Sequence, residues 1–208
     1  RFFKTGAGEY GEGDIFWGVS VPECRKVAKL YKDLSLTEVK QVLCSPVHEL
    51  RLTALVILLE QYASNPRTVY RTYIANRRWV NNWDLVDMTA PKIVGAYLWD
   101  QQDFSILYKF SKSRELWTRR IAIVATFAFI RQGDFEHTTA IAKILLEDPH
   151  DLIHKAVGWM LREIYKRDES LIKRFLRVNY TQIRRTTLRY TIERMDEEER
   201  LLYLKGNF

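Results

Sequence analysis

Residues 48–63 read HELRLTALVILLEQYA, a run that contains neither Gly nor Pro. Leu52, Leu55, Val56 and Leu59 recur at positions i, i+3, i+4 and i+7, which places them along one stripe of an α-helix. The same spacing recurs over residues 115–132, 151–167 and 181–195. No segment of the sequence has the alternating pattern of a β-strand. The sequence therefore predicts an all-α fold.

The helices of this fold are expected to be short and to follow one another closely. Four stretches carry Pro or Gly signals of the kind that separate helices: Ser45-Pro46, Asn65-Pro66, Gly133-Asp134 and Asp148-Pro149. The chain has 208 residues, a length that fits one domain with a substantial core, and we expect residues 1–208 to form it. The chain begins at Arg1 rather than Met, which is compatible with a truncated N-terminus.

Four of the expected helices begin alike, with a basic residue followed three positions later by a small one. They are Arg51–Ala54, Arg119–Ala122, Lys155–Gly158 and Arg184–Thr187. The starts at 119, 155 and 184 are 36 and 29 residues apart, and the 68 residues between 51 and 119 leave room for one more unit near position 84. Helix pairs repeated at this period are typical of a HEAT-like superhelix, an α-solenoid with a concave face.

The charge balance favours an anionic partner. Lys and Arg number 33 against 26 Asp and Glu, a net charge of +7, which points first to nucleic acid and second to an anionic membrane surface. If the helix starts line one concave face, a basic track results that would bind phosphates; its members are Arg51, Arg119, Arg120, Lys155, Arg184 and Arg185. The alternative is that these bases are solvated helix ends.

The extra unit falls on residues 80–87, which read VNNWDLVD and carry acids where the other units carry bases. Asn81 or Asn82 is a good N-cap, so a helix is expected to begin at about Trp83. Trp83 and Asp87 are then i and i+4 and share one face. Asp84 lies in the first turn, where an acid interacts favourably with the helix dipole. The dipole explains Asp87 less well.

A carboxylate on a DNA-binding face is repelled by phosphates unless it meets a cation. DNA offers a cation either as an alkylated purine or as an oxocarbenium-like deoxyribose formed when a glycosidic bond breaks. Opposite unit charges about 4 Å apart attract by about 4 kcal/mol at an effective dielectric constant of about 20, which is worth roughly three orders of magnitude in rate if realised in the transition state. The face of Trp83 also attracts cations. The alternative role of Asp87 is an ion pair with a neighbouring Arg.

A second tryptophan, Trp159, follows a glycine in the run HKAVGWMLRE, residues 154–163. Gly158 would allow another backbone or a ligand to approach closely. Trp159 then lies one turn beyond Lys155 and is a second candidate for contact with a ligand. The alternative is that Trp159 belongs to the core.

Three motifs in order, VNNWDLVD, LWTRRIAI (116–123) and HKAVGWMLRE, resemble those of the AlkD-type DNA glycosylases, the DNA alkylation repair proteins. The similarity extends over the whole chain, including FWGVSVPECRKVAK (16–29). The resemblance implies a HEAT-like superhelix that excises 3-methyladenine and 7-methylguanine without flipping the base into a pocket. It also implies that Asp87 is the catalytic aspartate, that Trp83 and Trp159 contact deoxyribose, and that Arg120 contacts a phosphate. An aromatic residue that approaches DNA would fall near Phe2.

Other patterns indicate no further chemistry. Gly6–Gly11 reads GAGEYG and matches GxGxxG, but neither a strand nor a βαβ unit accompanies it. His150 and His154 lack a third ligand, and Cys24 and Cys44 have no metal spacing, so we expect free thiols in a reducing cytosol and neither metal nor cofactor. No lysine stands out as a Schiff-base nucleophile. The longest apolar run, residues 121–130, is too short to span a membrane.

The sequence thus predicts a cytoplasmic, monomeric and monofunctional DNA glycosylase. Its expected partner is double-stranded DNA with alkylated bases, its expected reaction is hydrolysis without strand cleavage, and no obligate protein partner is expected. One alternative is a non-catalytic HEAT-like module that binds bent or branched DNA, since fold alone does not determine activity. Another is a protein-binding scaffold.

Overall fold

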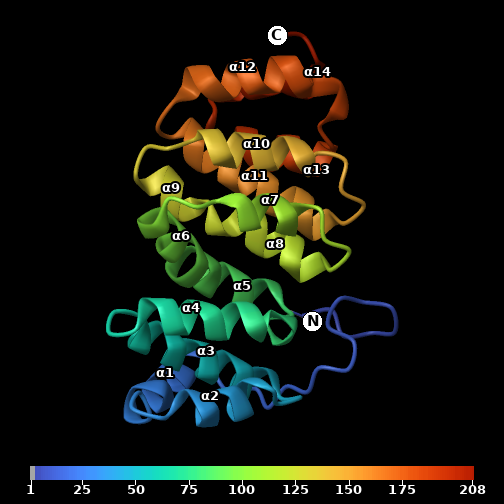
Figure 1. Cartoon of the computed structure of the whole chain (residues 1–208). Coiled ribbons are helices and arrows are strands. Elements are labelled where there is room, and N and C mark those ends of the chain that lie inside the picture. The colour runs from blue at the N-terminus through green and yellow to red at the C-terminus, as the bar shows by residue number, and fades with distance from the viewer. Residues whose placement is uncertain (1–2) are drawn as a thin grey trace. The chain divides into compact units, whose positions relative to one another are not determined.

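The computed structural model describes residues 3–208, and its regular structure is helical throughout (Figure 1). Within these residues no strand forms, and extended backbone pairs only at an isolated bridge between Ile15 and Val47. The predicted all-α fold is confirmed. The chain forms two compact units, Arg1–Tyr97 and Leu98–Phe208. None of the described helices is long and apolar enough to cross a membrane.

The first unit is built around helix α3 (His48–Tyr62). The other elements are α1 (Val21–Leu30), α2 (Leu36–Leu43), α4 (Pro66–Ala75), the 3₁₀ turn η1 (Arg77–Trp79), α5 (Trp83–Thr89) and the π-helical segment η2 (Ala90–Gly95). Both α1 and α2 pack on α3. Helix α3 is therefore buried on all sides from His48 to Leu58, with Leu50 only partly covered. This burial exceeds the single apolar stripe that the sequence predicts.

Serine caps fix where the first two helices begin. The backbone N–H of Ser20 donates to Glu23 (2.9 Å), and that of Ser35 donates to Glu38 (2.8 Å). These capping boxes satisfy N–H groups that have no partner inside the helix. The bonds from the serine side chain and backbone lower the pKa of both Glu23 and Glu38.

The segment before α1, residues 3–19, runs as an arm along the start of α3. Ile15 N–H donates to Pro46 O (3.2 Å), and His48 N–H donates to Ile15 O (2.8 Å). The buried carboxylate of Glu49 accepts the N–H groups of Trp17 (3.1 Å) and Gly18 (2.8 Å). Burial raises the pKa of Glu49, but these backbone hydrogen bonds outweigh burial and leave the pKa below its usual value. The arm is thus fastened to α3 by backbone hydrogen bonds on both sides of Ile15.

The second unit follows the same helical pattern. Helix α6 (Ala96–Gln101) contains the boundary; the later elements are α7 (Ser105–Ser111), α8 (Leu116–Ala125), α9 (Phe127–Arg131), α10 (Glu136–Ile144), α11 (Asp151–Tyr165), α12 (Glu169–Asn179), η3 (Tyr180–Gln182), α13 (Arg185–Thr191), η4 (Ile192–Arg194) and α14 (Glu197–Lys205). Helix α11 is central and packs on α8, α12 and α13.

Gly158 is the point at which α13 comes closest to α11. A Cβ atom at this position would lie 2.5 Å from Cβ of Tyr190 and 2.7 Å from the carbonyl oxygen of Thr187. Such distances are too short for any side chain, so only glycine allows this packing. The sequence-based expectation of a close approach at Gly158 is confirmed, and the approaching group is a backbone.

Two of the predicted helices differ from the structure. Residues 115–132 form α8 and α9 rather than one helix, and the break falls at Thr126, whose hydroxyl donates to Ile123 O (2.6 Å). A Thr hydroxyl that binds a carbonyl of its own helix competes with the helical backbone pattern. The helix predicted over residues 181–195 begins only at Arg185, because Tyr180–Gln182 forms a separate 3₁₀ turn.

Candidate active site

The start of α5 brings Trp83 and Asp87 onto one helix face. The Asn82 side chain accepts the N–H of Trp83 (2.8 Å), so Asn82 is the N-cap, as predicted. Trp83 is the first residue of α5 and Asp87 the fifth, and both side chains are half-buried. An aromatic ring and a carboxylate one turn apart are therefore both within reach of solvent on the first unit.

Asp87 has the same position in its helix as two basic residues have in theirs. Arg120 is the fifth residue of α8, and Lys155 is the fifth residue of α11. The bases that define the sequence repeat do not share one helix position: Arg51 and Arg119 are the fourth residues of α3 and α8, Lys155 is the fifth of α11, and Arg184 is the N-cap of α13.

The N-terminal arm forms one wall beside Trp83. The indole Nε1 lies 3.3 Å from the hydroxyl of Tyr10, to which it donates, and the Phe3 ring lies 5.6 Å from the Trp83 ring. Phe3 also stacks on Phe16 (4.8 Å) and lies 4.9 Å from the ring of His48. The two contacts with Trp83 join residues more than 70 positions apart in the chain. Phe2, where the resemblance would place a DNA-approaching aromatic residue, lies outside the described residues.

The Asp84 carboxylate pairs with a histidine of α3. His48 Nε2 lies 2.8 Å from Oδ2 of Asp84, and His48 Nδ1 lies 4.0 Å from Oδ2 of Asp14. Asp84 therefore lies in the first turn, as expected, and in addition meets a base from α3. The charge of Asp84 is therefore paired within the fold.

A buried chain of hydrogen bonds joins Tyr73, Thr89 and the carbonyl oxygen of Leu85. The Thr89 hydroxyl donates to Leu85 O, so the hydrogen between Tyr73 Oη and Thr89 Oγ1 (3.0 Å) comes from Tyr73. Burial raises the pKa of Tyr73 well above its usual value, and the negative charge of Asp87 raises it further. The Asp87 carboxylate thus lies close enough to affect the buried Tyr73 hydroxyl, which remains neutral.

Three of the six residues in the expected basic track are engaged inside the fold. Arg51 is 1% exposed, and its Nη2 lies 2.8 Å from Oδ1 of Asp14. Arg119 binds Asp148 through Nε (2.6 Å) and Nη2 (3.2 Å). Arg120 is 5% exposed and donates to Leu152 O. The prediction that Arg51 lines an open phosphate-binding face is wrong, because its guanidinium is buried and pairs with Asp14 of the N-terminal arm.

The other three bases of the track reach solvent. Lys155 is half-exposed and pairs with Asp151 (2.9 Å) one turn before it. Arg184 and Arg185 are exposed, and Arg185 also donates to Leu204 O (2.7 Å). A surface ion pair such as that of Lys155 contributes little to stability.

Trp159 and the two histidines have distinct surroundings in the second unit. Trp159 is half-buried, and its ring lies 5.8 Å from that of Phe127. It therefore differs from the fully buried neighbours on either side, Gly158 and Met160, and part of its ring is open to solvent. His150 caps α11 by accepting Leu152 N–H (3.1 Å), and His154 bonds to Asp148 O.

Comparison with known proteins assigns the chain to a family. A family model described as DNA alkylation repair enzyme matches residues 1–195. A solved structure described as a predicted DNA alkylation repair enzyme from Enterococcus faecalis has 16% sequence identity and a TM-score of 0.75, and the alignment covers 90% of this chain and 92% of that one. That likeness concerns the fold. No curated protein matches. Since the family model spans nearly the whole sequence, the chain belongs to the DNA alkylation repair enzyme family.

Proposed function

We propose that the protein is a DNA glycosylase that hydrolyses the N-glycosidic bond of cationic alkylated purines, 3-methyladenine and 7-methylguanine, and leaves the strand intact. The observation that carries this proposal is the pairing of Asp87 with Trp83 on one half-exposed face of α5, at a helix position where α8 and α11 have bases. Family membership supports a role in the repair of alkylated DNA, and base excision repair is the route that this reaction would serve.

The reaction follows from the charges. As the bond from C1′ to the purine nitrogen breaks, its electron pair moves to the base and cancels the positive charge there. Positive charge then develops on the sugar, where the Asp87 carboxylate stabilises it and helps to place the attacking water. The water oxygen bonds to C1′ and loses a proton, giving an abasic site. This electrostatic stabilisation acts mainly in the transition state, which is the condition for raising the rate.

The remaining roles are assigned by residue type and by the resemblance. Trp83 presents an aromatic face to the sugar beside Asp87, where cation–π attraction adds about 0.5–2 kcal/mol. Trp159 is the second deoxyribose contact. Lys155, Arg184 and Arg185, whose side chains reach solvent, bind phosphates, and Arg120 has this role through the resemblance alone. We further propose that the protein is a cytoplasmic monomer and that its helices form one HEAT-like superhelix, a single domain with a concave basic face for duplex DNA.

A non-catalytic DNA-binding module is the alternative, and one observation favours it. Phe3 and Tyr10 contact Trp83, so part of the indole surface is already covered by the arm. A module of this kind would bind duplex DNA with salt-dependent affinity and release no base. A protein-binding scaffold would show little salt-dependent DNA affinity.

The test is a release assay on duplex DNA that contains 7-methylguanine. We expect free 7-methylguanine to appear with an equal amount of abasic sites, and the strand to remain whole until alkali is added. DNA binding without release would replace the proposal by the non-catalytic module. Strand breaks before alkali treatment would show that the protein is not monofunctional.

A further inference from the structure

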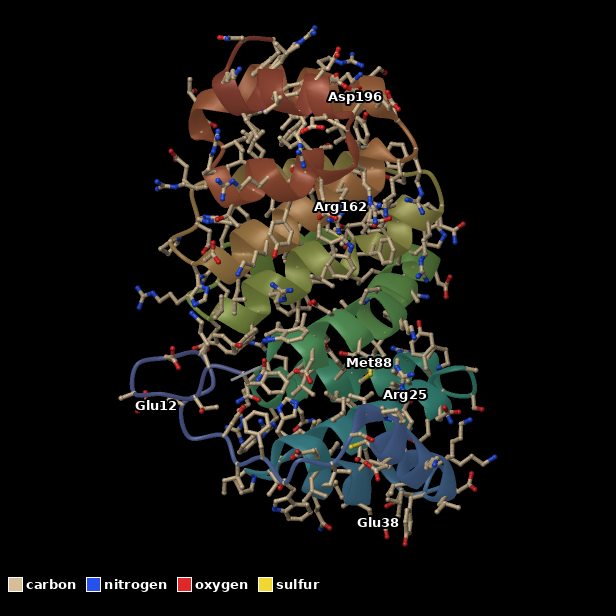
Figure 2. The ribbon with its side chains drawn as sticks, turned by 180° about the vertical axis from the view of Figure 1, so that it is seen from behind. Glu12, Arg25, Glu38, Met88, Arg162 and Asp196 are labelled. Carbon is tan, nitrogen blue, oxygen red and sulfur yellow. The ribbon has the colours of Figure 1, made fainter. Side chains whose placement is uncertain are left out.

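A pocket of about 630 Å³ opens on the first unit between α1, α3 and the segment that joins α5 to η2. Three bases line it: Arg25 and Lys29 from α1, and Lys92 from η2. Val56, Leu59 and Met88 supply its apolar lining, and Glu60 is its one acid. Figure 2 shows the labelled Arg25 and Met88 side by side on this face. The track predicted from the helix starts includes none of these bases.

The positive charge of this pocket is not neutralised by the fold. Arg25, Lys29 and Lys92 are exposed, and among the described residues none of the three has a carboxylate within salt-bridge distance. Three positive charges and the negative charge of Glu60 leave a net charge of +2. Arg25 and Lys29 are also i and i+4 on one helix, an arrangement of like charges that destabilises an isolated helix. Repulsion between these bases therefore destabilises the fold, whereas their positive charge favours the binding of an anion.

The pocket begins next to Asp87 in the chain. Met88, which lines the pocket, follows Asp87 directly, and Lys92 follows Asp87 by five residues along the continuous segment α5–η2. One DNA strand carries a phosphate about every 3.4 Å of duplex axis. A strand with its reacting sugar at Asp87 would thus have further phosphates close enough to reach a pocket that begins at the next residue, Met88.

We propose that the Arg25–Lys29–Lys92 pocket binds phosphodiester groups of the DNA strand beside the lesion. This inference rests on the proposed function, because it takes the position of the reacting sugar from Asp87. A DNA backbone fits better than a free phosphate, since the bases are exposed side chains at separate points of an open pocket. A site for a small anion typically has convergent, buried donors. The apolar lining, which includes Met88, suits the deoxyribose carbons between two phosphates.

The experiment compares two triple variants that lose the same charge. R25Q/K29Q/K92Q removes the pocket bases, and K26Q/K40Q/R71Q removes three exposed bases of the same unit that do not line the pocket. Affinity for an undamaged duplex is measured over a series of NaCl concentrations. We expect the slope of log K against log salt to fall by about two to three for the pocket variant and by less than about one for the control. At the lower salt concentrations the pocket variant should bind at least about tenfold more weakly.

Glu60→Gln provides a test of opposite sign. Removal of the one acid from the pocket should tighten duplex binding by roughly twofold or more, because a charge that repels phosphate is lost. Equal losses in the two triple variants, or no loss in either, would overturn the proposal. Selective displacement of DNA from the wild-type pocket by millimolar inorganic phosphate at constant ionic strength would instead identify a site for a free anion and would also overturn it.

The titration measures binding of undamaged DNA, in which no reaction occurs. Its outcome is therefore independent of the release assay that tests the glycosylase activity. If the wild-type protein releases 7-methylguanine but the two triple variants bind alike, the pocket assignment fails and the proposed function stands. If no base is released but only the pocket variant loses its salt dependence, the pocket stands as a site for the DNA backbone, and the glycosylase assignment fails together with the placement of the pocket beside a lesion.

Discussion

Replacing Asp87 by asparagine is expected to slow the release of 7-methylguanine by about three orders of magnitude and to leave duplex affinity nearly unchanged. A carboxylate about 4 Å from a unit positive charge gains about 4 kcal/mol at an effective dielectric constant of about 20, and each 1.36 kcal/mol of barrier corresponds to a factor of ten in rate. Asparagine keeps the size of the side chain and removes its charge. Single-turnover release at saturating protein measures the effect on the chemical step alone.

Asp33→Asn is the matched control. Asp33 is an exposed acid of the same unit, so its replacement changes the net charge equally and should alter release by less than about twofold. A rate for Asp87→Asn within a factor of a few of the wild type would remove Asp87 from the mechanism. An equal loss of rate in both variants would show that the effect is not specific to position 87.

Replacing Arg51 by alanine is expected to lower the free energy of unfolding by about 3–5 kcal/mol. The side chains of Arg51 and Asp14 are both buried, with Nη2 of Arg51 2.8 Å from Oδ1 of Asp14, and Arg51 also donates to the carbonyl oxygens of Ser45 (3.0 Å) and Pro46 (3.1 Å). The variant leaves the Asp14 carboxylate buried without its main partner, which is the expensive way to break an ion pair. Urea unfolding followed by circular dichroism measures the loss.

The double variant Asp14→Asn/Arg51→Met is the control for this interpretation. It removes both charges and keeps apolar volume at position 51, so it should be more stable than Arg51→Ala alone. A loss below about 1 kcal/mol in Arg51→Ala would indicate that Arg51 is solvated in solution. In that case the earlier assignment of Arg51 to a phosphate contact would regain support.

The sequence predicts well those features of the fold that depend on residues close together in the chain. The apolar spacing of residues 48–63 places α3 correctly, and Asn82 marks the first residue of α5 through one hydrogen bond to its neighbour. The position of Gly158 in an apolar helix predicts a close approach by another segment, and the structure contains that contact, with α13. Each of these features depends on residues within one helix or on the absence of a side chain.

Features that depend on distant residues are not visible in the pattern. Arg51 begins its helix motif as Lys155 does, yet it is buried because Asp14, 37 positions earlier, folds back onto it. His48 reaches Asp84 across 36 positions. The bases of the open pocket, Arg25, Lys29 and Lys92, belong to no repeated motif and come together only through the packing around α3. The motif at a helix start shows where a residue lies in the repeat. It does not show whether another segment of the chain covers that residue.

The most direct test of whether the Asp87 carboxylate meets a cation uses two abasic analogues in otherwise identical duplexes. One carries a positively charged pyrrolidine in place of the sugar, as a mimic of the oxocarbenium-like state, and the other carries neutral tetrahydrofuran. Transition-state mimics bind about 10²-fold or more tightly when a site is complementary to that state. We expect the wild-type protein to prefer the cationic duplex by about two orders of magnitude, and Asp87→Asn to bind both duplexes alike. Equal affinity of the wild-type protein for the two duplexes would contradict the role of Asp87.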